Sequence, residues 1–127
     1  MKHNYHWHRE NVNLLNIAIS TRNSVDISFI LGNTSDGEEI AEIQCSKVVL
    51  LNMQSTIETK LPIFVGDVTV EVVTNSKISQ SLRSNNYGFF YEDGNSLSSD
   101  IDTIYMIRIE GGEIDVKIVA ACINIKG

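Results

Sequence analysis

Apolar side chains recur at every second position in two stretches of this sequence, and this alternation limits what the chain can fold into. Residues 25–31 place Val, Ile, Phe and Leu at alternate positions, and residues 68–72 place three valines in the same way. Successive side chains of a strand point to opposite faces, so a period of two predicts strands with one buried face. Similar runs predict further strands at residues 14–20, 39–45, 47–53 and 87–91.

Turn-forming residues separate these predicted strands. Gly, Asn, Asp, Thr and Ser cluster at residues 32–37, and Gly, Asp and Asn recur at residues 66–67 and 93–95. These residue types favour tight turns. Short strands with regular turns between them are typical of a sandwich or barrel. The sequence therefore predicts an all-β fold, an antiparallel β-sandwich or a flattened barrel.

At most one short helix is expected. In residues 77–84 the apolar Ile78 and Leu82 are four positions apart, which matches one face of a helix. The chain of 127 residues has the length of one ordinary domain, so residues 1–127 are predicted to form a single β domain. Residues 1–10 are expected to form either an amphipathic first strand or a partly ordered N-terminal arm.

The pair Gly111-Gly112 lies between two β-rich runs and predicts a tight hairpin. Two consecutive glycines supply the positive φ angles that a two-residue turn requires. This turn would place Ile109 opposite Ile114. It would also place Arg108 opposite Asp115, which is a favourable cross-strand pair of opposite charge. One face of the hairpin would then be apolar, with Tyr105, Ile107, Ile109, Ile114, Val116 and Ile118.

The apolar positions of the last predicted strand change phase after Ile118. Beyond that residue they fall on Val119, Ala121, Ile123 and Ile125. One extra residue in a strand shifts the alternation, so a bulge is predicted near Ala120-Ala121.

Two cysteines, Cys45 and Cys122, lie far apart in the sequence and belong to no C-x-x-C pair. Zinc and thioredoxin-type sites lack their usual spacing here. Both cysteines are expected to be small buried side chains, and a disulfide between neighbouring strands is the alternative.

The chain carries ten basic and sixteen acidic residues, a net charge of −6. Its basic residues are scattered singly, whereas nucleic-acid binding depends on clustered Lys and Arg. Neither nucleic acid nor a membrane is therefore expected as a partner. An acidic surface would attract a basic protein, although a net charge of this size also serves solubility. No signal peptide and no apolar stretch of membrane-spanning length is present, so the cytoplasm is the expected location.

The richest acidic segment runs from residue 92 to residue 102, where loop residues are expected. Four of its carboxylates, Glu92, Asp93, Asp100 and Asp102, are the predicted partner-binding residues, because loops on a rigid scaffold often carry binding residues. A calcium site is the alternative, but Leu97 stands where the EF-hand spacing needs an oxygen ligand.

A histidine cluster near the N-terminus offers a second hypothesis, a metal-dependent enzyme. His6, His8 and Glu10 would share one face of a strand, and His3 could bind copper or nickel together with the terminal amine. The H-x-H arrangement invites comparison with the cupin metal motif, but the spacing to Glu10 is too short and no later histidine follows. We therefore predict no metal and no cofactor. Nucleophile-elbow, P-loop and H-E-x-x-H motifs are also missing, so no catalytic residue is predicted.

Aromatic side chains support a third hypothesis. Trp7, Tyr87 or Tyr91 could form a stacking platform for a sugar or another small ligand. Residues 87–91 depart from the pattern of an RNA-binding sheet at two positions, which favours an ordinary core strand.

Two segments, DGEEIAEIQC at residues 36–45 and IEGGEIDVKI at residues 109–118, resemble parts of small uncharacterised β-proteins of Gram-positive bacteria. Some of those proteins are encoded beside polymorphic toxins and are regarded as immunity proteins. The resemblance implies a stoichiometric inhibitor that binds a cognate toxin. A non-enzymatic protein-binding module is therefore the leading functional prediction.

Overall fold

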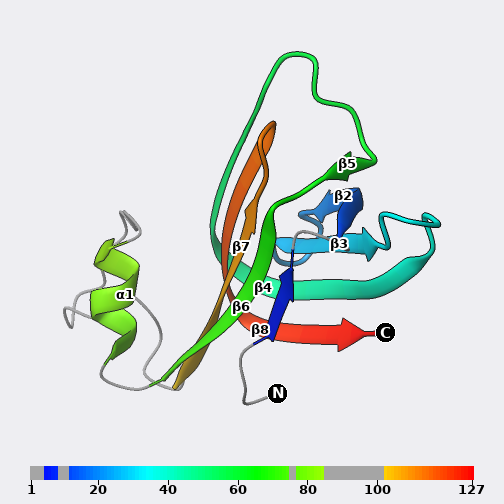
Figure 1. The fold of residues 1–127 in the computed structure, drawn as a ribbon. Coiled ribbons are helices and arrows are strands. Elements are labelled where there is room, and N and C mark those ends of the chain that lie inside the picture. The colour runs from blue at the N-terminus through cyan, green and yellow to red at the C-terminus, as the bar shows by residue number, and fades with distance from the viewer. Residues whose placement is uncertain (1–4, 9–11, 75–76, 85–101) are drawn as a thin grey trace.

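The computed structural model describes residues 5–8, 12–74, 77–84 and 102–127. In these ranges eight strands form one antiparallel sheet in the order β1-β6-β7-β8-β4-β3-β2-β5 (Figure 1). The elements are β1 (Tyr5–His8), β2 (Asn13–Ser20), β3 (Asp26–Gly32), β4 (Glu39–Ser55), β5 (Ile63–Phe64), β6 (Asp67–Thr74), α1 (Ile78–Ser84), β7 (Thr103–Glu110) and β8 (Ile114–Lys126). The predicted all-β fold with one short helix is confirmed. The strand expected at residues 87–91 lies outside the described residues.

The sheet curls into a half-barrel because two long strands, β4 and β8, run through both of its halves. β6 and β7 stand upright in Figure 1, and β2 and β3 run across them. We call these the β6–β7 half and the β2–β3 half. β4 pairs with β8 over most of its length, but it pairs with β3 only as far as Cys45. The second part of β4 therefore belongs to the β6–β7 half alone.

The bend in β4 follows from two local irregularities. Lys47 has a φ of 54°, in the left-handed region that residues with a side chain rarely adopt. The register with β8 then shifts by one between Val48 and Leu50, which leaves Val49 as an extra residue. The bulge lies opposite Ala120, close to its predicted place, but the prediction assigned the extra residue to the wrong strand. Two separate strands at residues 39–45 and 47–53 were also a wrong prediction, because pairing with β8 continues on both sides of the bend.

The main core fills the space between the two halves of the sheet. Phe29, Ile43 and Ile118 are completely buried there, and every strand from β2 to β8 except the short β5 contributes buried residues. The alternating positions of β3 and of the hairpin point inward, as predicted, but Val25, the first residue of the predicted run, precedes β3 and is exposed. The buried members are Val12, Leu14, Ile27, Phe29, Leu31, Ala41, Ile43, Cys45, Val65, Val68, Val70, Ile107, Ile109, Ile114, Val116, Ile118 and Ala120.

A second, smaller cluster lies on the outer face of the β6–β7 half, under α1. The predicted helical pair, Ile78 and Leu82, is buried there against Val73, Ile104 and Val119. A helix of seven residues has little stability of its own, so this packing holds it in place.

The β7–β8 hairpin forms, but its turn lies one position later than predicted. The N–H of Gly111 donates to the carbonyl oxygen of Ile114 at 2.8 Å, so the chain reverses at residues 112–113. Ile109 consequently pairs with Val116, and Arg108 pairs with Lys117 instead of Asp115. Each residue of β7 therefore pairs with a residue of β8 two positions beyond the predicted one. Because the side-chain period is two, the predicted apolar face is kept.

Candidate functional site

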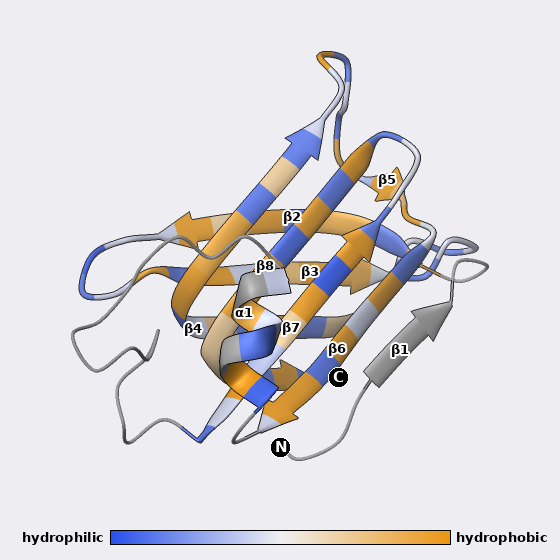
Figure 2. Cartoon of the chain, turned by 90° about the vertical axis from the view of Figure 1, so that its left-hand side faces the viewer, coloured by the Kyte–Doolittle hydropathy of each residue, from blue (hydrophilic) through white to orange (hydrophobic). Residues whose placement is uncertain are grey.

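The outer face of the β6–β7 half divides into two zones (Figure 2). α1 covers the zone at one end, where β6 finishes and β7 starts, and no described element covers the zone at the hairpin end. The open zone carries alternating polar and charged positions of β6, β7 and β8. It is the candidate partner-binding surface of this chain.

Three carboxylates occupy neighbouring positions across this open zone. Asp67 is the register partner of Glu110, and Glu110 is the register partner of Asp115. We call Asp67, Glu110 and Asp115 the acidic row; Gln54 of β4 continues it on the far side of β8. Like charges directly opposite each other destabilise a sheet, so this row needs a compensating cation.

Arg108 supplies that compensation from the next row of the sheet. Its Nε lies 2.9 Å from Oε1 of Glu110, and its Nη2 lies 3.8 Å from Oδ2 of Asp115. The predicted Arg108–Asp115 pair therefore exists as a diagonal contact. All three side chains are about half exposed, so these ion pairs contribute little to stability and the carboxylates remain accessible.

Gly66 fixes the start of β6 next to the end of β7. Its N–H donates to the carbonyl oxygen of Glu110 at 2.5 Å, and a Cβ at this position would lie 2.9 Å from the same oxygen. Only glycine allows this close approach without a shift of the backbone. The contact places Asp67 directly beside Glu110 in the acidic row.

The predicted hairpin implies that Glu110 and Asp115 share the face opposite its apolar face, but sequence reasoning missed Asp67. The alternation within each strand of the hairpin places Glu110 and Asp115 on that face. Asp67 joins them only through the pairing of β6 with β7, which links residues far apart in the sequence. No local sequence pattern carries that information.

The predicted partner-binding acids lie elsewhere. Glu92, Asp93 and Asp100 are outside the described residues. Asp102 is exposed, accepts a hydrogen bond from the Thr103 hydroxyl at 3.2 Å, and immediately precedes β7. It therefore lies at the opposite end of β7 from Glu110, and the structure does not bring it to the acidic row.

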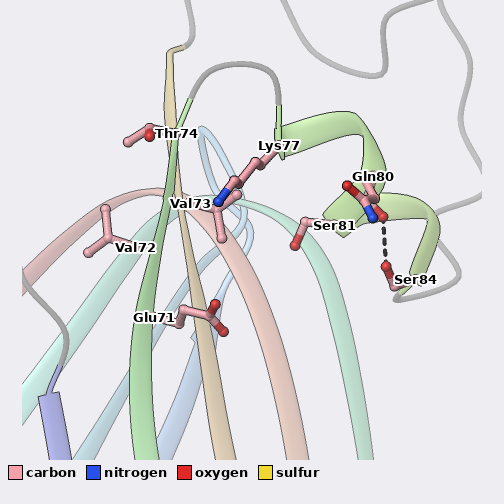
Figure 3. Close-up of a pocket in the computed structure, with 8 residues that line it drawn as sticks. All are labelled: Glu71, Val72, Val73, Thr74, Lys77, Gln80, Ser81 and Ser84. Carbon is pink, nitrogen blue, oxygen red and sulfur yellow. Dashed lines mark hydrogen bonds between the residues drawn. The ribbon is translucent and has the colours of Figure 1, made fainter.

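A shallow groove of about 480 Å³ lies between α1 and the end of β6 (Figure 3). Lys77 extends from the start of α1 across it, and Glu71 lines its β6 side. Its serines already donate hydrogen bonds, Ser84 to the Gln80 carbonyl oxygen and Ser81 to Sδ of Met106, both at 2.7 Å. Ser84 therefore bonds within its own helix, and Ser81 bonds to a side chain of β7.

A second depression, of about 310 Å³, lies over the end of β2 and the start of β3 and is lined in part by Cys45. Burial raises the pKa of the Cys45 thiol from 9.0 to about 12, so the thiol stays protonated at neutral pH and is a poor nucleophile. Cys45 and Cys122 are both free. The two residues lie on neighbouring strands, but Cys122 is exposed, so the prediction that both cysteines are buried is wrong for Cys122.

The other candidate groups lie at the edge of the described structure or outside it. His6, Trp7 and His8 belong to β1, which pairs with β6 and confirms a first strand at residues 5–8. His3, Glu10, Tyr87 and Tyr91 are outside the described residues. Within the described ranges, no three His, Cys, Asp or Glu side chains are grouped to hold a metal ion, and no helix there has the length and apolarity to cross a bilayer.

Comparison with known proteins identifies a family. A family model whose description reads only "-like" matches residues 8–127. The chain belongs to this family. The description of the family names no reaction, ligand or partner, so membership assigns no role to the acidic row. No curated protein matches the chain.

One solved structure has a similar fold. The crystal structure of an uncharacterized protein from Neisseria gonorrhoeae aligns with a TM-score of 0.59 and 19% sequence identity, covering 98% of this chain and 98% of that chain. At this identity the similarity concerns the fold alone. It supports the same curled all-β architecture along nearly the whole chain.

Proposed function

We propose that this chain is a non-enzymatic protein-binding module that binds a basic protein partner through the acidic row. The observation that carries the proposal is the position of Asp67, Glu110 and Asp115 in consecutive register on a sheet face that no described element covers. A sheet holds such a row more rigidly than a loop would, which lowers the entropy lost on binding. The resemblance of residues 36–45 and 109–118 to proteins of toxin–immunity loci supports an immunity-type inhibitor, and a toxin is then the partner.

The charge of the chain supports the same function. A net charge of −6 draws a basic partner from a distance and raises the association rate. The half-exposed carboxylates of Glu110 and Asp115 can exchange Arg108 for an arginine or lysine of the partner at little cost, because surface ion pairs are weak. The acidic row can therefore both speed the encounter with a basic partner and form ion pairs with it in place of Arg108.

The experiment compares two matched triple variants in binding to the product of the neighbouring gene. Asp67→Asn, Glu110→Gln and Asp115→Asn together remove three charges from the acidic row. Glu38→Gln, Glu39→Gln and Glu58→Gln remove three charges from exposed positions elsewhere. The first variant should lower the association rate constant about tenfold at low salt and weaken its salt dependence, because steering depends on local charge. The control variant should change the association rate constant much less.

Surface plasmon resonance at several salt concentrations measures both rate constants. Equal losses in the two variants would show that only total charge matters and would contradict a role for the acidic row. Absence of near-stoichiometric binding to the neighbouring gene product would contradict the immunity-type function itself.

A further inference from the structure

Within the part of the chain that the structure describes, the second part of β4 forms a free edge of the sheet. Residues Leu50–Ser55 pair with β8 without interruption, from Leu50 opposite Val119 to Ser55 opposite Ile114. On their other side, no strand among the described residues pairs with them, because the pairing with β3 ends at Cys45. Figure 2 shows this part of β4 as a lateral border of the β6–β7 half.

Two hydrogen bonds show which residues of this edge turn their backbone N–H and C=O groups away from β8. The N–H of Thr56 donates to the carbonyl oxygen of Glu113 at 3.2 Å, so this pair is hydrogen-bonded across the ladder. Ile114 instead accepts from Gly111 of the hairpin, away from β4. Hydrogen-bonded pairs alternate in an antiparallel ladder, so Leu51, Met53 and Ser55 turn their N–H and C=O groups to the free side.

The same residues expose apolar surface. Leu51 and Met53 are 37% and 45% exposed, although their register partners on β8, Ile118 and Val116, are completely buried. Both side chains lie on the core-facing side of the sheet, at the border that the β2–β3 half does not cover. A strand added along this edge would cover both and would satisfy the free backbone groups.

The edge also lacks the protection that natural free edges normally carry. Charged residues, prolines and bulges usually prevent edge-to-edge pairing. Residues 48–57 contain no charged residue and no proline, and the nearest charges are Lys47 and Glu58. The bulge at Val49 lies before the regular segment and leaves it undisturbed.

Charge indicates which occupant fits this edge. A basic partner is attracted to the acidic row, and nothing on the neutral edge attracts it. Two copies of a chain with a net charge of −6 repel each other on most faces, but at residues 48–57 they meet without like charges in register. We propose that Leu51–Ser55 pairs antiparallel with the same segment of a second copy, giving a two-fold dimer with one continuous sheet.

The symmetric register centres on Met53. Its N–H and C=O groups face the free side, so Met53 can pair with Met53 of the partner subunit, and Leu51 can pair with Ser55 of the partner subunit. The exposed apolar side chains then cover one another across the two-fold axis. Such an interface is small, so the dimer forms at high micromolar concentration.

Analytical ultracentrifugation over a concentration series tests the proposal. The wild-type protein should show a monomer–dimer equilibrium. Met53→Lys places two positive charges in register, and Met53→Pro removes the outward N–H; both variants should stay monomeric with a wild-type circular dichroism spectrum. Ala18→Lys makes the matched change on the free edge of β2 and should still dimerise.

Cysteine cross-linking tests the register without relying on disruption. In a Cys122→Ser background, Met53→Cys should form a disulfide-linked dimer on mild oxidation, because hydrogen-bonded cross-strand partners lie about 5.5 Å apart at Cα. Ile57→Cys, at a fully exposed position just beyond the strand, should not. A wild-type protein that stays monomeric throughout, Met53 variants that dimerise normally, or a dimer abolished by Ala18→Lys would each overturn the proposal.

Discussion

The two parts of β4 both turn apolar side chains toward the core face of the sheet but lie in opposite environments. In the first part, Glu39–Cys45, the strand lies between β3 and β8, and its inward side chains Ala41, Ile43 and Cys45 are buried. In the second part β8 is its only partner among the described strands, and Leu51 and Met53 are exposed to 37% and 45%. Alternation therefore determines which face a side chain takes, and the number of neighbouring strands determines whether that face is buried.

The largest expected difference between the two parts is in packing energy. Ile43→Ala should lower the free energy of unfolding by about 2–5 kcal/mol, because it leaves a cavity in the main core. Met53→Ala should change it by less than about 0.5 kcal/mol in dilute, monomeric protein, as expected for an exposed site. Urea denaturation measures both. Similar losses of unfolding free energy at the two sites would show that Met53 is covered in the folded chain, and the two parts of β4 would then not differ in burial.

A second test concerns Cys45, the last buried residue before the bend. Its pKa is about 12 in the folded chain against 9.0 ordinarily, so the thiol keeps its proton longer when folded. This contribution to stability is complete below pH 9 and is lost as the pH rises to 12, with a slope of at most about 1.4 kcal/mol per pH unit.

Urea denaturation between pH 8 and 11 measures this slope, and Cys45→Ala should show a shallower one than wild type. Thiol labelling serves as the control, since the exposed Cys122 should react in the native protein and Cys45 only after unfolding. Rapid native labelling of Cys45 would show that the first part of β4 opens easily.

The smallest expected effect is at the bend itself. Lys47 has a φ of 54°, which is unfavourable for a residue with a Cβ. Lys47→Gly should therefore raise the free energy of unfolding by about 0.5–1 kcal/mol. Lys117→Gly, the same change at a regular position of β8, should lower it by up to about 1 kcal/mol. Thermal denaturation compares the two, and changes of the same sign would argue against strain at Lys47.

Most strands could be predicted from the sequence because their alternation is a local property. The helix at residues 78–84 was predicted for the same reason, since Ile78 and Leu82 share one helical face. The hairpin shows where this reasoning ends. Gly111 and Gly112 both permit a turn, and shifting it by one position changes every partner but leaves the same side chains facing the core. Alternation therefore cannot choose between the two registers.

Local patterns were enough to predict most of the strands, the inward face of each and the acidic net charge, because side-chain period and composition act within a few neighbouring residues. Three features became visible only in the folded chain: the continuous path of β4, the acidic row of Asp67, Glu110 and Asp115, and the edge at Leu51–Ser55 that no described strand pairs with. These features depend on which distant strands become neighbours. The packing of the whole core selects these neighbours, and no single segment of the sequence encodes that packing.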